Sequence, residues 1–421
     1  STLRPLGQGA LGGGGASWPA GPGAVPLRCR FTGQRRRFIG PPLGLLLMML
    51  TVIIACTATA CAPGAEVDFA VAQPPKVDIQ PSDGATEVNP VDQARIAVTD
   101  GVFQEIRLTT PAGKEVTGQL SSDRAFWTLG EPLGYDKTYT WSGIVTGSDG
   151  AQIQVHSSFH TINPAHLTSA RLNVADNATY GIAMPIALTF SSKVSDKAAV
   201  ERALSVQTSV PTEGAWAWLD DTRVHWRPKT YFTANTQVHI TAKLYGLSLG
   251  DGAYGQQDLT SSFSIGRPYV LKGDTQTHHL VGYANGVQVA DYRASYGLDA
   301  DPRRVTRSGT HVVMAKFPVF FMSDQKYDYH NVEARWAVQI SNNGEFAHSA
   351  PWSVYQQGKK NVSHGCINLS PSAAKAVFDT VLPGDPVEIT GSSQELGAQD
   401  GDYYDWTIPW DAWVAKSAQT H

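Results

Sequence analysis

Short runs of alternating apolar and polar residues, separated by turn signals, recur along most of the 421 residues of this chain. Between residues 77 and 164, for example, the turn sequences Ser82-Asp83-Gly84 and Ser148-Asp149-Gly150 interrupt such runs. Alternation with a period of two places every second side chain on the same face of a strand, so this pattern predicts half-buried β-strands. The 40 glycines and 25 prolines supply turns, and charged residues make up only 17% of the chain. We therefore expect a mainly β fold.

The alternating pattern of residues 77–164 returns in residues 165–267. Trp127 is matched by Trp226, and Ser157-Ser158-Phe159 is matched by Ser261-Ser262-Phe263. A repeat of about 100 residues that holds several short strands predicts two tandem immunoglobulin-like β-sandwiches, one in each range. Such domains either bind a partner or act as a spacer. The spacer role is favoured here because no chemically reactive side chains converge in them.

A third β-rich region follows at residues 268–391. Asn285-Gly286, between two alternating runs, predicts a hairpin over residues 280–290. Ser370-Pro371 predicts a helix from Pro371 to about Val381, with Ser370 as N-cap and the proline in the first turn. Further strands are expected at Thr310–Met314, Val319–Met322, Trp336–Ile340, Glu345–His348 and Val387–Ile389, with a turn at Asn342–Gly344.

The start of the chain has the features of an export signal. Residues 1–34 are rich in Gly and Pro, and we expect them to be disordered or to lie upstream of the true start. Three arginines at 35–37 precede an apolar run at 43–55, which is short for a membrane span and suits the core of a signal peptide. Small residues then lead to Cys61, in a sequence that resembles a bacterial lipobox.

We expect Cys61 to be lipidated, with Cys56 as the alternative; an uncleaved membrane anchor is the other interpretation. Residues 62–76, rich in Ala and Pro, are predicted to form a tether. In each case the body of the protein is expected outside the cytoplasmic membrane.

Cys366 is the single cysteine after the leader, since the other three lie within the first 61 residues. An isolated thiol in an exported protein is either buried and inert or reactive. Cys366 stands in the polar sequence Ser363-His364-Gly365-Cys366-Ile367-Asn368, downstream of His348. A thiolate attacks carbonyl carbon readily, and a neighbouring imidazole accepts the thiol proton, so these residue types favour a cysteine nucleophile. A buried structural cysteine and a zinc site are the alternatives; His364 and Cys366 lie too close together for a typical pair of zinc ligands.

The sequence from His348 to Ser363-His364-Gly365-Cys366-Ile367-Asn368 resembles the signature of the L,D-transpeptidase (YkuD-type) family. The order of lipoprotein signal, two Ig-like domains, catalytic domain and Trp-rich tail is similar to that of actinobacterial members. The resemblance implies that a cysteine attacks a meso-diaminopimelate carbonyl in a peptidoglycan tetrapeptide stem and releases D-Ala. The acyl group then passes to the side-chain amine of an acceptor stem, which gives a 3→3 cross-link. The resemblance also implies acylation by carbapenems, with no cofactor and no metal.

The resemblance further implies roles for individual residues. Cys366 is the nucleophile, His348 is the base, and Ser349 orients the imidazole through its backbone carbonyl. His364, Gly365 and Cys366 frame an oxyanion hole. Asn368 stands where many relatives carry an arginine, which leaves the contact to a substrate carboxylate open. The residues expected to bind substrate are Met322, Tyr329, His330, Trp352, Ser363 and Asn368, with Tyr327 as an alternative to Tyr329 and with Trp336 assigned to the core or the wall.

The C-terminal extension, residues 392–421, carries Trp406, Trp410 and Trp413. Because tryptophan buries a large area, we expect this tail to pack back onto an Ig-like domain or the catalytic domain, with a carbohydrate platform as the alternative. The chain is thus predicted to be an exported, lipid-anchored transpeptidase. An L,D-carboxypeptidase that uses the same thioester and a non-catalytic wall-binding lipoprotein are the competing hypotheses. The net charge of -4 gives no reason to expect nucleic acid as a partner.

Overall fold

The computed structural model describes residues 73–324, 329–401 and 403–419. The predicted signal peptide, both candidate lipidation cysteines and most of the predicted tether lie outside the described residues. Within the described ranges, no helix is long and apolar enough to cross a membrane.

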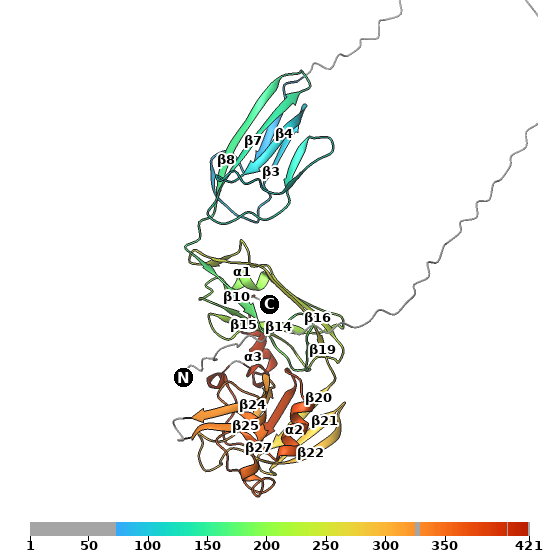
Figure 1. The fold of residues 1–421 in the computed structure, drawn as a ribbon, viewed down its shortest axis with the longest axis vertical. Coiled ribbons are helices and arrows are strands. Elements are labelled where there is room, and N and C mark those ends of the chain that lie inside the picture. Colours follow the sequence, from blue (N-terminus) through green and yellow to red (C-terminus); the bar gives the residue numbers. More distant parts are fainter. Residues whose placement is uncertain (1–72, 325–328, 402, 420–421) are drawn as a thin grey trace, which may run out of the picture. The chain divides into compact units, whose positions relative to one another are not determined.

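The first β-sandwich packs two four-stranded sheets around a single core (Figure 1). Phe103 and Trp141 are fully buried in that core, and Trp127 packs edge-on against Trp141. One sheet has the order β1 (Lys76–Gln80), β3 (Arg95–Thr99), β6 (Phe126–Leu129), β5 (Gly118–Leu120), and the other has the order β2 (Ala85–Val88), β8 (Gln152–Thr161), β7 (Thr138–Gly147), β4 (Gly101–Thr109).

The second β-sandwich repeats this two-sheet plan with one short helix, α1 (Lys197–Arg202). Its cores contain Ile186, Trp226 and Ile240 among other buried residues. One sheet has the order β10 (Ala170–Leu172), β12 (Ile186–Phe190), β15 (Arg223–Pro228), β14 (Gly214–Trp218), and the other has the order β11 (Thr179–Tyr180), β19 (Leu259–Ile265), β16 (Gln237–Ala242), β13 (Leu204–Thr208). A small sheet of β17 (Ser248–Gly250), β18 (Ala253–Gly255) and β9 (His166–Thr168) completes it.

The two sandwiches share one packing detail that explains the repeated tryptophan. A Cβ added at Gly118 would lie 1.8 Å from the ring of Trp127, and a Cβ added at Gly214 would lie 2.0 Å from the ring of Trp226. In each domain the glycine lies on the strand next to the tryptophan and leaves the space that the indole fills. The prediction of a mainly β protein with tandem Ig-like sandwiches is confirmed.

The third domain is built on a nine-stranded sheet that also contains the predicted hairpin, whose turn residues Asn285 and Gly286 have φ of 50° and 77°. The order is β23 (Gly309–Val312), β28 (Pro386–Thr390), β20 (Tyr269–Asp274), β21 (His279–Ala284), β22 (Val287–Ser295), β27 (Ile367–Leu369), β26 (Phe346–Ser349), β25 (Tyr329–Gln339), β24 (Ala315–Asp324). The short strand β27 was not among the predicted strands, because three residues are too few to show alternation.

The predicted helix is α2 (Pro371–Thr380), and it packs against β25 and β26. The side chain of Ser370 accepts a hydrogen bond from the backbone N–H of Ala373, as expected of an N-cap. The buried face of the helix consists of Ala373, Ala374 and Val377, which join the core under the sheet. The helix also contacts β27, so it supports both the strand that carries His348 (β26) and the strand that follows Cys366 (β27).

The C-terminal extension forms η3 (Ala398–Asp400), η4 (Asp405–Thr407) and α3 (Trp410–Val414). It packs on the second sandwich, where the Arg227 guanidinium lies 4.7 to 5.3 Å from the ring centroids of three tail tryptophans. Trp413 is fully buried, and its indole N–H donates to the carbonyl of Ala215 at 2.9 Å. Its ring is therefore not available to stack on a carbohydrate, and the tail packs on an Ig-like domain as expected.

Candidate active site

His348 and Cys366 come to the same cavity because β26 and β27 run parallel as neighbours. His348 is paired in register with Asn368 on β27, and Cys366 directly precedes that strand. The two side chains line the same cavity of about 440 Å³. The lining consists of Met322, Val332, His348, Trp352, Val362, Ser363, His364, Cys366 and Asn368.

The imidazole of His348 is buried, with 3% of the residue exposed. Its Nδ1 lies 2.9 Å from the backbone oxygen of Ser349. Because a carbonyl oxygen can only accept, Nδ1 carries the proton in this contact and Nε2 keeps its lone pair. Burial lowers the pKa of His348 to about 4, and the hydrogen bond to Ser349 offsets only part of this shift. The ring is therefore a neutral base at neutral pH.

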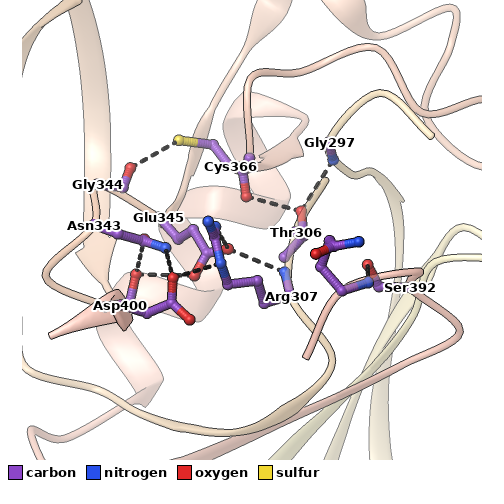
Figure 2. A network of polar contacts seen from close by, with 12 residues as sticks. Gly297, Thr306, Arg307, Asn343, Gly344, Glu345, Cys366, Ser392 and Asp400 are labelled. Carbon is purple, nitrogen blue, oxygen red and sulfur yellow. Dashed lines mark hydrogen bonds and ion pairs between the residues drawn. The ribbon is translucent and has the colours of Figure 1, made fainter. Parts of the chain in front are cut away.

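The thiol of Cys366 is half-buried and donates to the backbone oxygen of Gly344, with Sγ at 3.6 Å (Figure 2). Loss of solvent around the sulfur raises the pKa of Cys366 to about 12; a backbone hydrogen bond at Phe346 lowers it, and the Glu345 carboxylate raises it further. At neutral pH the site therefore rests as a neutral thiol beside a neutral imidazole.

The loop before Cys366 is held by the hydroxyl of Ser363. This hydroxyl donates to the carbonyl of Cys366 at 2.6 Å and accepts the backbone N–H of Gly365 at 3.1 Å. Gly365 has a φ of +118°, in the left-handed region that favours glycine. Its N–H is already used within the loop, so the structure does not support the prediction that it joins an oxyanion hole.

The predicted substrate-binding residues divide into three groups. Met322, Trp352, Ser363 and Asn368 line the cavity, and the Trp352 ring centroid is 6.0 Å from that of His348. His330 lies exposed on β25 and does not contribute to the described lining of the cavity, so its predicted place in the site is not supported. The side chain of Tyr329 and all of Tyr327 lie outside the described residues.

Asn368 faces inward rather than toward bulk solvent. Its Nδ2 donates to the hydroxyl of Ser353 at 3.1 Å, and the residue is buried. Trp336 packs against Phe378 of α2, with ring centroids 5.4 Å apart, and belongs to the core as expected.

Two apolar wall residues, Val332 and Val362, were missed by the sequence analysis. A valine in a β-rich chain carries no signal that separates a cavity wall from an ordinary core position. The backbone oxygen of Gly344, which accepts a hydrogen bond from the Cys366 thiol, was likewise missed. The sequence of a turn does not indicate which side chain its carbonyl groups face.

Comparison with known proteins identifies the family of the domain that contains this cavity. Residues 268–389 match the L,D-transpeptidase catalytic domain, and residues 85–248 match a bacterial Ig domain. The chain is 44% identical over 401 residues to L,D-transpeptidase 5 of Mycobacterium tuberculosis, which covers 94% of this chain and 89% of the relative. It is 34% identical over 390 residues to L,D-transpeptidase 2 of the same species, covering 89% of this chain and 94% of the relative.

Among solved structures, that of LD transpeptidase LdtMt1 in complex with imipenem aligns with 32% identity and a TM-score of 0.45, over 52% of this chain and 97% of that chain. The alignments with both L,D-transpeptidase 5 and L,D-transpeptidase 2 cover nearly the whole of this chain and nearly the whole of the relative. The chain belongs to the L,D-transpeptidase family, whose reaction is an acyl transfer.

Proposed function

We propose that this chain is a peptidoglycan L,D-transpeptidase that forms 3→3 cross-links through a thioester on Cys366, with His348 as the base. The observation that carries the proposal is the placement of both side chains on one cavity, with the Nδ1 proton of His348 engaged by Ser349. Since that contact leaves Nε2 as the basic nitrogen, the imidazole is prepared to accept the thiol proton.

In the first step, the sulfur of Cys366 forms a bond to the diaminopimelate carbonyl carbon of a donor tetrapeptide stem. The thiol proton leaves its hydrogen bond with the Gly344 carbonyl, passes to Nε2 of His348 and goes from there to the amine of D-Ala as the C–N bond breaks. Because thiol and imidazole both start neutral, the proton transfer accompanies the attack rather than preceding it. The products are an acyl-enzyme and free D-Ala.

In the second step, the side-chain amine of an acceptor stem attacks the thioester. A C–N bond forms, the C–S bond breaks, and the amine proton returns to sulfur through His348. The backbone N–H of Cys366 is assigned to the developing oxyanion, with His364 on the adjoining part of the cavity wall. The N–H of Gly365 is used by Ser363. Met322, Val332, Val362 and Trp352 form the apolar part of the cavity wall against the stem.

Asn368 does not replace the arginine of other relatives as a charged contact. Its amide is engaged with Ser353 inside the domain. In the proposal it helps to hold β27 beside Ser353 and, from the cavity wall, offers the substrate only a neutral amide.

Export and lipidation complete the proposal. The basic and apolar leader directs the chain across the cytoplasmic membrane, and Cys61, or alternatively Cys56, receives the lipid. The two Ig-like domains then act as a spacer between the membrane and the peptidoglycan. Labelling with a radioactive fatty acid in a bacterial host tests this; a Cys61→Ala chain that keeps its label moves the site to Cys56, and an unlabelled wild type contradicts the proposal.

Product analysis with a purified disaccharide-tetrapeptide tests the reaction. The proposal expects cross-linked dimer and free D-Ala from the wild type and neither from Cys366→Ala. Trimmed tripeptide without dimer would identify water as the acceptor and the enzyme as an L,D-carboxypeptidase. A wild type that gives neither product would leave a non-catalytic wall-binding role.

A further inference from the structure

A buried polar network connects the C-terminal extension to the turn beside Cys366 (Figure 2). Asp400, in η3, pairs with the guanidinium of Arg307 and accepts a hydrogen bond from Nδ2 of Asn343 at 2.9 Å. Arg307 also pairs with Glu345. Oε1 of Glu345 lies 3.2 Å from Nη1 and 3.0 Å from the backbone nitrogen of Arg307. Asp400 and Glu345 are 3% and 2% exposed, so both carboxylates depend on their partners. Asp400 also accepts hydrogen bonds from Gly397 and Gln399, and Glu345 accepts one from Ser341.

The network encloses the Asn342–Glu345 turn from two sides. Asn343 is bound by Asp400, and Glu345 is bound by Arg307 and lies 3.6 Å from Nδ1 of the fully buried His311. Gly344, between them, has a φ of +99°, and its carbonyl accepts a hydrogen bond from the Cys366 thiol. The position of that carbonyl is therefore fixed by charged contacts on either side of it.

The same short segment also holds the loop on the other side of the thiol. Thr306, directly before Arg307, donates to the carbonyl of Gly365 at 2.8 Å and accepts the N–H of Gly297 at 3.0 Å. Residues 306 and 307 thus set the position of the residue before Cys366 and of the turn that its thiol faces. A change in one of them alters the geometry between sulfur and carbonyl.

We propose that Asp400 is a positioning residue for Cys366; the inference rests on the proposed role of Cys366 as nucleophile. Through Arg307 and Asn343, Asp400 fixes the Gly344 carbonyl that sets the position of the Cys366 sulfur in the cavity shared with His348. Attack on a carbonyl carbon needs a narrow range of sulfur positions, and displacement by about 1 Å can reduce a rate by about 10²-fold. Asp400 itself touches neither substrate nor sulfur.

Single-turnover acylation over a range of imipenem concentrations up to saturation tests this, with the rate constant, the apparent affinity and the final fraction of acylated protein measured separately. Asp400→Ala is expected to lower the rate constant by about tenfold with full final acylation and unchanged apparent affinity. Asp400→Asn, which keeps the oxygen that Asn343 bonds, is expected to recover part of the rate. The matched control is Asp379→Ala, which removes a carboxylate paired with Lys375 on the exposed side of α2 and leaves the rate constant at the wild-type value.

Two outcomes overturn the inference while the proposed function stands. One is an Asp400→Ala protein that reacts with the wild-type rate constant. The other is a lower final fraction with an unchanged rate constant, which means that Asp400 only stabilises the fold. A wild type that imipenem does not acylate contradicts the proposed function itself, and the inference with it.

Discussion

Two buried histidines, one under the C-terminal extension and one beside the cavity, have opposite surroundings. In the second sandwich, Nδ1 of His225 lies 2.8 Å from the carboxylate of Asp405, and both residues are closed off from solvent. In the catalytic domain, the Nδ1 partner of His348 is a neutral backbone carbonyl, and the ring lines a cavity that it shares with a thiol. The first arrangement joins two segments of chain, and the second leaves a nitrogen available for chemistry.

The difference teaches which features separate a structural histidine from a reactive one. Burial is common to both residues and does not distinguish them. The open cavity, the thiol on its wall and the uncharged Nδ1 partner are specific to His348. The two sites should therefore respond to the same substitution in different ways.

Replacing His348 by alanine should have the largest effect on the reaction. Without the base, the neutral thiol has no acceptor for its proton, and the acylation rate constant should fall by about 10²–10⁴-fold. Stopped-flow acylation by imipenem measures this, with a melting curve as the control for folding. An acylation rate constant within threefold of wild type would remove His348 from the mechanism.

His225→Ala should show the opposite profile. The substitution leaves the buried carboxylate of Asp405 without this hydrogen bond, and a buried polar group that loses its partner costs about 1–3 kcal/mol of stability. Denaturant unfolding followed by tryptophan fluorescence should report this loss, because Trp406 directly follows Asp405 and packs on Arg227 of the same sandwich. Under conditions where the protein stays folded, the acylation rate constant should stay near wild type; a large fall in that constant would mean that the two sites are not separate in function.

The pH dependence sharpens the contrast further. The pKa of His348 is lowered to about 4, so its basic form persists as the pH falls and is lost only near that value. Acylation measured by brief pH-jump mixing should be flat between about pH 5 and 8 and should fall about tenfold per pH unit below about 4. A midpoint near the ordinary histidine value of about 6.5 would show that the ring is solvated in the working enzyme.

The smallest expected effect concerns the support of the two catalytic strands. Ser370→Ala removes the cap of α2, which should cost about 1 kcal/mol of stability. Replacement by threonine, another capping residue, serves as the matched control and should retain most of the stability. Because α2 packs on β25 and β26 without entering the cavity, neither variant should change the acylation rate constant; a tenfold change would place the helix in the mechanism.

The sequence allowed the sandwiches, the hairpin and the capped helix to be predicted because their signals are local. Alternation, Asn285-Gly286 and Ser370-Pro371 each act within a few residues. The match between Trp127 of the first repeat and Trp226 of the second also proved informative, since each indole fills a space left by a glycine on the next strand.

The polar connections of the site could not be predicted in this way. Asp400 and Arg307 are far apart in sequence, and Gly344 acts through a backbone oxygen that every residue has. The engagement of the Gly365 N–H by Ser363 depends on the loop conformation, which the motif alone does not specify. Such features follow from tertiary packing and need coordinates.

The most direct test of the central proposal is the mass of the intact protein after incubation with imipenem, followed by peptide mapping of the adduct. The account predicts one added imipenem per chain, on the peptide that contains Cys366, and no added mass on Cys366→Ala. An unmodified wild type, or an adduct on another residue that persists in Cys366→Ala, would contradict it.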